Sequence, residues 1–319
     1  MSAEPAPAPA PPPAPEPGPA PAAAAAPLAS RRDRWFARLQ QRLPAAALDN
    51  LAFRLANIRN RIVRELLIRL FVEAYEVDLK EAEFDEIGKY GSFNAFFTRA
   101  LKPGARPLPA DPQLLVSPAD GCISQIGPVR DGSLVQAKGI DYTVADLLTD
   151  PSLAASFRDG TFCTIYLAPR DYHRVHMPCA GSLRQWSYVP GRLFSVNAST
   201  ARAVPGLFSR NERIVAVFDT AFGPLALVMV GALLVGGIET VWHGRVTPPH
   251  AQDGAPAHYA PMHPVRLERG AEMGRFMMGS TVILLAPAGA LGWDAELGPE
   301  RVVRMGEELA TMLRKRPPA

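Results

Sequence analysis

The stretch RIVAVFDTAFGPLALVMVGALLVGGIETVW, residues 213–242, decides the fold of this chain. Its apolar residues come in short runs that Gly, Pro and Asp interrupt. Such runs are typical of strands that are buried on both faces and joined by tight turns. Similar runs occur in LLVSPADGCISQIG (114–127), TFCTIYLAPRDY (161–172) and STVILLAPAG (280–289). These four stretches predict a β-rich core.

Two uncharged segments need a separate test as membrane spans. Residues 220–238 and 276–293 are 19 and 18 residues long, which is close to the length of a spanning helix. Each contains a proline and at least three glycines, however, and these residues interrupt helices. Paired buried strands with tight turns explain this composition better than a transmembrane helix does.

The first 70 residues of the 319-residue chain differ from the rest in composition. Eleven of the 33 prolines fall within the first 27 residues, and residues 1–30 are rich in Pro and Ala, so we expect a disordered tail there. The formal net charge of +3 comes from residues 31–70, which hold ten arginines against three acidic residues. Three cysteines in a chain of this length exclude a disulfide scaffold.

Residues 31–75 have the pattern of amphipathic helices. Trp35 and Phe36 lie among arginines in a first helix that should stop near Pro44, and leucines and isoleucines then recur at spacings of three and four. This face could lie on an anionic membrane, or it could pack against the protein's own domain beneath a solvated arginine face. We expect an α+β fold in which these helices precede a sandwich- or barrel-like catalytic domain, residues 76–319. The apolar stripe consists of Leu48, Leu51, Leu55, Ile58, Ile62, Leu66 and Leu70.

Three short motifs could carry chemistry, although each has an ordinary structural explanation. Asp120 in Ser-Pro-Ala-Asp-Gly is most simply a turn residue. His173 and His176, three residues apart, suit acid–base catalysis, a structural role or metal binding. Ser280 in Met-Gly-Ser-Thr-Val-Ile follows Gly279, whose carbonyl a neighbouring hydroxyl can approach closely because glycine lacks Cβ.

Together and in this order, these motifs resemble the phosphatidylserine decarboxylases. The resemblance covers roughly residues 45–315, and Met278 stands where many relatives carry leucine, which is an apolar change of similar size. The further motifs that carry the resemblance are FNAFFTR (93–99), QAKG (136–139), LFSRNER (207–213), GIETVW (237–242) and EMGRF (272–276).

Members of that family are precursors that cut themselves before the serine of a Gly-Ser-Thr motif. The resemblance therefore implies a cut between Gly279 and Ser280, which gives a β chain of residues 1–279 and an α chain of residues 280–319. The serine becomes a covalent pyruvoyl group after its hydroxyl oxygen attacks the preceding carbonyl.

The resemblance also implies roles for the motif residues. Asp120, His176 and Ser280 would form a charge relay for self-cleavage, in which the imidazole takes the hydroxyl proton and Asp120 stabilises it. The pyruvoyl group from Ser280 would form a Schiff base with phosphatidylserine, so that carbon dioxide is lost and phosphatidylethanolamine results. His173 would donate a proton to the product, with Tyr166 as a neighbour of the same site. We expect neither pyridoxal phosphate nor a metal.

A lipid substrate would explain the basic helices as an interfacial anchor. We expect a peripheral protein on the cytoplasmic face of a bacterial cell membrane. Its partners would be phosphatidylserine, the anionic membrane surface, its own associated α and β chains and a second copy in a homodimer, with no nucleic acid. Phe93, Phe96 and Phe97 could extend the apolar surface, but we expect them in the core.

Two other functions compete with this interpretation. A lipid hydrolase would use Asp120, His176 and Ser280 as a conventional triad, and its chain would stay intact with a free Ser280 hydroxyl. A non-enzymatic membrane-binding protein would use the same motifs as turns, and its properties other than stability would not depend on His176.

Overall fold

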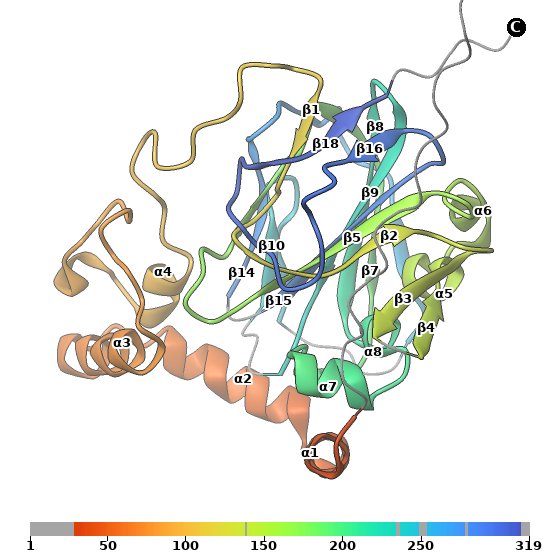
Figure 1. Cartoon of the computed structure of the whole chain (residues 1–319). Coiled ribbons are helices and arrows are strands. Elements are labelled where there is room, and N and C mark those ends of the chain that lie inside the picture. The colour runs from red at the N-terminus through yellow and green to blue at the C-terminus, as the bar shows by residue number, and fades with distance from the viewer. Residues whose placement is uncertain (1–28, 138, 234–236, 249–253, 278–279, 314–319) are drawn as a thin grey trace, which may run out of the picture.

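The computed structural model describes residues 29–137, 139–233, 237–248, 254–277 and 280–313. Within these ranges, the helices of residues 31–97 precede a core of antiparallel strands, and four short helices lie among those strands, as Figure 1 shows. The helices are α1 (Arg31–Arg42), α2 (Ala45–Ala56), α3 (Arg61–Tyr75), the 3₁₀ helix η1 (Ile87–Lys89), α4 (Phe93–Phe97), α5 (Val144–Leu148), α6 (Pro151–Ala155), α7 (Ala198–Ala203) and α8 (Leu207–Arg210).

The largest sheet has nine strands within the described part of the chain, and its neighbouring strands are antiparallel. No pairing between its edge strands closes this part of the chain into a barrel. In spatial order the strands are β12 (Ala257–Tyr259), β7 (Gly181–Val189), β8 (Arg213–Thr220), β9 (Gly223–Val230), β15 (Ser280–Ala286), β5 (Thr161–Leu167), β2 (Gly121–Pro128) and β17 (Val302–Val303), and β13 (Arg266–Leu267) also pairs with β7.

Other described strands form three smaller sheets. Their strands are β11 (Gly244–Thr247), β10 (Ile238–Thr240), β14 (Glu272–Phe276) and β6 (Arg174–His176) in one sheet, β1 (Leu114–Val116), β18 (Glu308–Met312) and β16 (Leu291–Trp293) in the second, and β3 (Ser133–Ala137) with β4 (Ile140–Thr143) in the third.

The stretch that decides the fold forms a hairpin at the centre of the large sheet. Strands β8 and β9 pair from Arg213 opposite Val230 to Thr220 opposite Gly223, whose φ of 117° is readily adopted by glycine. Every residue of the neighbouring strand β15 is buried, so both of its faces are covered by protein. That burial explains the uncharged apolar runs.

The strand interpretation of the two uncharged segments is confirmed. Residues 220–238 contain β9, and residues 276–293 contain β15 and β16. A search of the described residues finds no helix with the length and apolar character that crossing a bilayer requires.

One hydrophobic cluster joins the four sheets. It includes Leu227 and Leu284 of the large sheet, Val175 and Met273 of the four-stranded sheet, and Leu309 of β18. The expected α+β fold, with a β-rich core after N-terminal helices, is therefore confirmed. The three cysteines are free.

A second, smaller cluster belongs to the helices. Ile68 of α3 packs there with the α4 residues Phe93, Phe96 and Phe97. The exposed fraction of each of the three phenylalanines is 7% or less, so the prediction that they lie in the core is confirmed. Helix α4 therefore connects α3 to the rest of the protein.

The helices predicted within residues 31–75 are confirmed, and their ends follow from capping. Ser30 forms a capping box with Asp33 at the start of α1, which ends before Pro44, and the Asn60 side chain caps α3. The apolar stripe does not pack against the domain, however, because five of its members are largely exposed. These are Leu51, Leu55, Ile62, Leu66 and Leu70, with exposed fractions between 48% and 79%.

Candidate active site

Ser280 lies at the first position of the central strand β15, opposite Leu167 of β5. Its exposed fraction is 0%, and its hydroxyl oxygen has no hydrogen-bond partner among the described residues. A buried hydroxyl without a partner costs free energy and calls for an explanation. The hydroxyls of Thr240 and Thr281 are in the same state, so the state alone does not distinguish Ser280. Met278 and Gly279, including the expected cleavage bond, lie outside the described residues.

The loop that follows β5 brings His173 into the interior, where its exposed fraction is 0%. Its Nδ1 lies 2.8 Å from the carbonyl oxygen of Asp171. Because a carbonyl only accepts, Nδ1 carries the proton and Nε2 presents a lone pair, which has no partner among the described residues. The ring packs on Phe97 with centroids 4.2 Å apart.

Burial sets the charge of His173. It lowers the pKa of this imidazole from 6.5 to about 3, so that the ring is neutral at pH 7. A neutral ring with its proton on Nδ1 can accept a proton at Nε2. It can donate from Nε2 only after it has accepted one.

His176 is a second neutral imidazole with a fixed tautomer. It lies on β6, and its Nδ1 donates to the carbonyl oxygen of Gly270 at 2.7 Å. The Tyr172 hydroxyl lies 2.9 Å from Nε2 and donates to its lone pair. Burial lowers the pKa of His176, and the bond to Gly270 and the charge of Glu272 oppose that effect.

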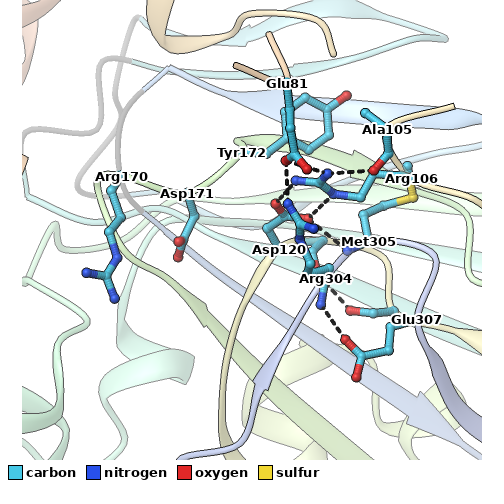
Figure 2. A network of polar contacts seen from close by, with 12 residues as sticks. Glu81, Ala105, Arg106, Asp120, Arg170, Asp171, Tyr172, Arg304, Met305 and Glu307 are labelled. Carbon is cyan, nitrogen blue, oxygen red and sulfur yellow. Dashed lines mark hydrogen bonds and ion pairs between the residues drawn. The ribbon is translucent and has the colours of Figure 1, made fainter. Parts of the chain in front are cut away.

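Asp120 lies in the bend before β2, within a network of ion pairs shown in Figure 2. Arg106 donates to both carboxylate oxygens, from Nε at 2.9 Å and from a terminal nitrogen. The amide of Met305 donates to the same carboxylate at 2.8 Å. Arg106 also pairs with Glu81 at 2.8 Å, and Glu81 pairs with Arg304.

Asp120 and His176 share no hydrogen bond within the described part of the chain. The acceptor that keeps the proton on Nδ1 of His176 is the Gly270 carbonyl oxygen and not the Asp120 carboxylate. The two groups are nevertheless close enough to interact by charge. Burial, which lowers the pKa of His176, is the largest influence on it, and the negative charge of Asp120 is among the influences that raise it. The expected relay among Asp120, His176 and Ser280 therefore stays a prediction.

Tyr166 lies on β5, directly opposite Thr281 of β15, while its neighbour Leu167 is opposite Ser280. Because successive side chains of a strand alternate between faces, Tyr166 shares a face with Thr281 and not with Ser280. Burial raises the pKa of its hydroxyl. A role for Tyr166 in the same site stays a prediction.

Sequence reasoning missed several groups that contact the expected site residues. Tyr172 and Arg106 are side-chain partners of His176 and Asp120, and the Gly270 partner of His176 is a backbone carbonyl. Tyr172 directly precedes His173 and lies four residues before His176 in the sequence, which was a usable signal. Arg106 lies in an irregular segment, and no side-chain pattern can mark a carbonyl.

A buried serine hydroxyl and two neutral imidazoles on a β-rich core are the groups that an acid–base site for serine activation needs. Among the described residues the serine hydroxyl bonds to neither ring, so their union in one site stays a prediction. The sequence profile described as phosphatidylserine decarboxylase matches residues 93–311. The chain belongs to the phosphatidylserine decarboxylase family.

Three bacterial relatives illustrate the extent of the match. The phosphatidylserine decarboxylase proenzyme of Pseudomonas fluorescens is 51% identical over 286 residues, which cover 89% of this chain and 99% of the relative. The proenzyme of Pseudomonas aeruginosa is 51% identical over 283 residues, or 88% of this chain and 98% of the relative. The proenzyme of Nitrosococcus oceani is 50% identical over 283 residues, or 88% and 92%.

Proenzymes of this family use a pyruvoyl group that is derived from a serine. The residues of this chain fit such a group, because the buried hydroxyl of Ser280 has no partner among the described residues that its conversion would disrupt.

Proposed function

We propose that this protein decarboxylates phosphatidylserine to phosphatidylethanolamine with a pyruvoyl group made from Ser280. The observation that carries the proposal is the buried, unpartnered hydroxyl of Ser280 at the start of β15, inside the segment that matches the family. Once formed, the group supplies an electron sink for the electron pair that stays on the substrate when the bond to the carboxylate breaks. The chain's own residues must then bind the headgroup and move protons.

The proposal includes self-cleavage between Gly279 and Ser280, which separates residues 1–279 from residues 280–319. In this step Nε2 of His176 takes the Ser280 hydroxyl proton, the oxygen attacks the Gly279 carbonyl carbon, and the Gly279–Ser280 C–N bond breaks as the proton passes to the Ser280 nitrogen, which gives an ester. Loss of the Cα proton of residue 280 then expels the Gly279 carboxylate, and water converts the remaining dehydroalanine to the pyruvoyl group and ammonia. The neutral state of His176 and its fixed lone pair at Nε2 support this role. The Tyr172 hydroxyl donates a hydrogen bond to that lone pair, and this bond has to break before Nε2 can take the Ser280 proton.

Asp120 completes the proposed relay through its charge, since a negative carboxylate near His176 favours the imidazolium that forms. The hydrogen bonds of Asp120 also support a structural role, which is to hold the two chains together after the cut. Met305 belongs to the future α chain, and Asp120 and Arg106 belong to the future β chain, so the carboxylate joins the two chains at the site.

His173 has the proposed role of moving a proton during decarboxylation. A substrate ammonium must lose a proton before its nitrogen can act as a nucleophile, and Nε2 of His173 is a free acceptor. This transfer requires the negative charge of the bound headgroup to raise the pKa of His173 above its value of about 3 in the free protein. The imidazolium then returns the proton to the carbon that has lost carbon dioxide. We place Tyr166 beside this site as a further, weaker element of the proposal.

We further propose that α1–α3 hold the protein on the cytoplasmic face of a bacterial membrane. Trp35 of α1 is 64% exposed and Ile62 of α3 is 79% exposed, and both lie in the arginine-rich segment. An exposed apolar face bordered by arginines suits the interface of an anionic bilayer. Such a large apolar surface is unusual for a helix that faces only water.

An aromatic cluster links this apolar face to the site. Phe71 of α3 packs on Phe97 of α4 with ring centroids 5.8 Å apart, and Phe97 packs on His173. A headgroup enzyme needs its site close to the bilayer surface, and this short path of packed rings supports that placement.

The decisive experiment is a denaturing gel with intact-mass analysis of the purified, active protein. We expect two fragments that separate at Gly279/Ser280, with the smaller blocked at its N-terminus by pyruvoyl. Ser280→Ala and His176→Ala should stay uncut, while His173→Ala should be cut but decarboxylate poorly. The exposed His263→Ala is the matched control and should behave like the wild type.

A single full-length band in an active preparation would instead support a hydrolase that keeps its serine. Normal cleavage of His176→Ala would remove that residue from the relay, and full turnover by His173→Ala would remove His173 from the decarboxylation.

A homodimer completes the proposal. Light scattering of the detergent-solubilised protein should give twice the mass of one precursor, and the mass of one precursor would contradict it.

A further inference from the structure

Arg99, which follows α4, is a buried cation with unused hydrogen-bond donors. Its exposed fraction is 5%, and one terminal nitrogen donates to the carbonyl oxygens of Arg170 at 3.1 Å and Asp171 at 3.4 Å. Nε and the other terminal nitrogen are buried and have no partner among the described residues. The same part of the chain offers Arg99 no acidic ion-pair partner, and its guanidinium lies 5.5 Å from the Phe96 ring centroid.

A second buried arginine shows that this state is not forced by burial. Arg213 is 1% exposed and also contacts only carbonyl oxygens, but all three of its guanidinium nitrogens donate. Its charge is therefore dispersed over fixed dipoles, which suits a structural role. Arg99 keeps two donor nitrogens free in a place that water hardly reaches. Burying a cation without a partner costs free energy, and a bound anion would offset that cost.

The position of Arg99 ties it to the candidate active site. The Asp171 carbonyl oxygen that it contacts is the same oxygen that accepts the proton on Nδ1 of His173. The free donors of Arg99 and the free Nε2 of His173 therefore belong to one small region. A ligand that contacts both groups needs an anionic group and a nearby amine.

We propose that Arg99 binds the phosphate of the phospholipid headgroup, an inference that rests on the proposed function. The headgroup also carries a carboxylate, but the reaction removes that charge as carbon dioxide. A cation on the carboxylate would stabilise the substrate more than the transition state and would slow the reaction. The phosphate keeps its charge throughout, so Arg99 can hold it without opposing the chemistry. Burial adds to the strength of the contact because salt hardly screens it.

The test compares Arg99→Met and Arg99→Lys with Arg170→Met in the full, self-cleaved protein. Arg170 is the matched control, because its side chain is exposed while its backbone carbonyl, which Arg99 contacts, is retained. For each variant we would measure cleavage on a gel, KM and kcat for phosphatidylserine in mixed micelles, and the inhibition constant of short-chain phosphatidylethanolamine. This product has the phosphate but lacks the carboxylate.

For Arg99→Met we expect normal cleavage, with KM and the inhibition constant both raised about ten- to a hundred-fold, as for a lost charged hydrogen bond. Arg99→Lys should lie between this variant and the wild type, and Arg170→Met should stay within about twofold of the wild type. If Arg99→Met is not cleaved, Arg99→Lys carries the same comparison.

Three results would overturn the proposal. One is a raised KM with an unchanged inhibition constant, which would assign Arg99 to the carboxylate. Another is an equal rise of KM and the inhibition constant in Arg170→Met, which would show that positive surface charge in general, and not Arg99, attracts the lipid. The third is an unchanged KM in a cleaved Arg99 variant. Failure of the proposed function would look different, because the cleaved wild type would then release no carbon dioxide from phosphatidylserine.

Discussion

At Asp120, the negative charge is compensated by a partner that almost no water reaches. The Arg106 side chain is 6% exposed and that of Asp120 is 13% exposed, and Arg106 contacts both carboxylate oxygens. Removing one member of a buried pair leaves the other charge uncompensated, which is far more costly than losing an exposed pair.

Replacing Arg106 should therefore destabilise the protein strongly. In the Ser280→Ala precursor we expect Arg106→Met to lose about 3 kcal/mol of unfolding free energy, and Arg106→Lys to lose less because it keeps the charge. Urea denaturation measures both. Arg184→Met is the control, because its pair with Asp219 is 43% and 52% exposed, and it should lose under about 1 kcal/mol. Equal losses at the two sites would contradict the prediction.

The buried state of His173 predicts a pH dependence of stability. Its pKa is about 3 in the folded protein against 6.5 when unperturbed. Below pH 6.5 the unfolded chain therefore binds a proton that the folded chain refuses. The contribution of His173 to stability is complete above pH 6.5 and is lost as the pH falls toward 3.

Between pH 7.5 and 5.5, the Ser280→Ala precursor should lose about 1.4 kcal/mol more unfolding free energy than the same precursor with His173→Gln. Urea denaturation at both pH values measures this difference. The exposed His263→Gln should keep the full pH dependence of the parent. A His173→Gln variant with the parent's pH dependence would show that His173 takes up its proton in the folded state.

At these residues, the sequence indicated the chemical groups better than their partners. Ser280, His173 and His176 are marked by their residue types and motif order, and the structure finds the serine hydroxyl buried and both rings neutral by burial. The groups that hold them depend on the fold. The Gly270 carbonyl reaches His176 across 94 residues, and no side-chain pattern records such a contact.

At the scale of elements, contacts within the chain do not explain why the α3 part of the apolar stripe is exposed. Leu66 is 55% exposed and lies on the face that we assign to the membrane, whereas Val302 of β17 is equally apolar and 61% exposed but lies on a strand of the large sheet. The two residues therefore form a matched pair for testing that face.

Leu66→Glu should weaken binding to anionic vesicles, because it loses apolar contact and adds a charge that the lipids repel. Together these effects should amount to about 2 kcal/mol, or about thirty-fold in affinity measured by cosedimentation. Val302→Glu should bind like the wild type. An unchanged affinity for Leu66→Glu, or an equal loss for Val302→Glu, would remove α3 from the membrane contact.

Elements were more predictable than their surroundings. The uncharged runs with glycine and proline breaks indicated the buried strands, because burial on both faces leaves no position for charge. Periodicity indicated the helices equally well. It could not say whether the apolar face of α3 is covered, since that depends on where α4 and η1 dock.

For the whole molecule, the proposed cut would fall at a point where the two chains are already interwoven. From residue 280 onward, β15 lies between β9 and β5 in the large sheet, β17 pairs with β2, and β18 lies between β1 and β16. The α chain thus supplies a fully buried central strand and parts of two sheets. Its departure would expose much of the main core, including Ile283 and Leu284.

The cut protein should therefore stay together until it unfolds. Size-exclusion chromatography under native conditions should give one peak that contains both fragments, although a denaturing gel separates them. Refolding from urea should differ between the forms, because a cut chain must bring β15 back as a separate molecule, and its yield should depend on protein concentration. The Ser280→Ala precursor keeps β15 tethered, so its yield should not show that dependence at low concentration. Elution of the small fragment alone from native protein would mean that the strand order of this structure does not persist after cleavage.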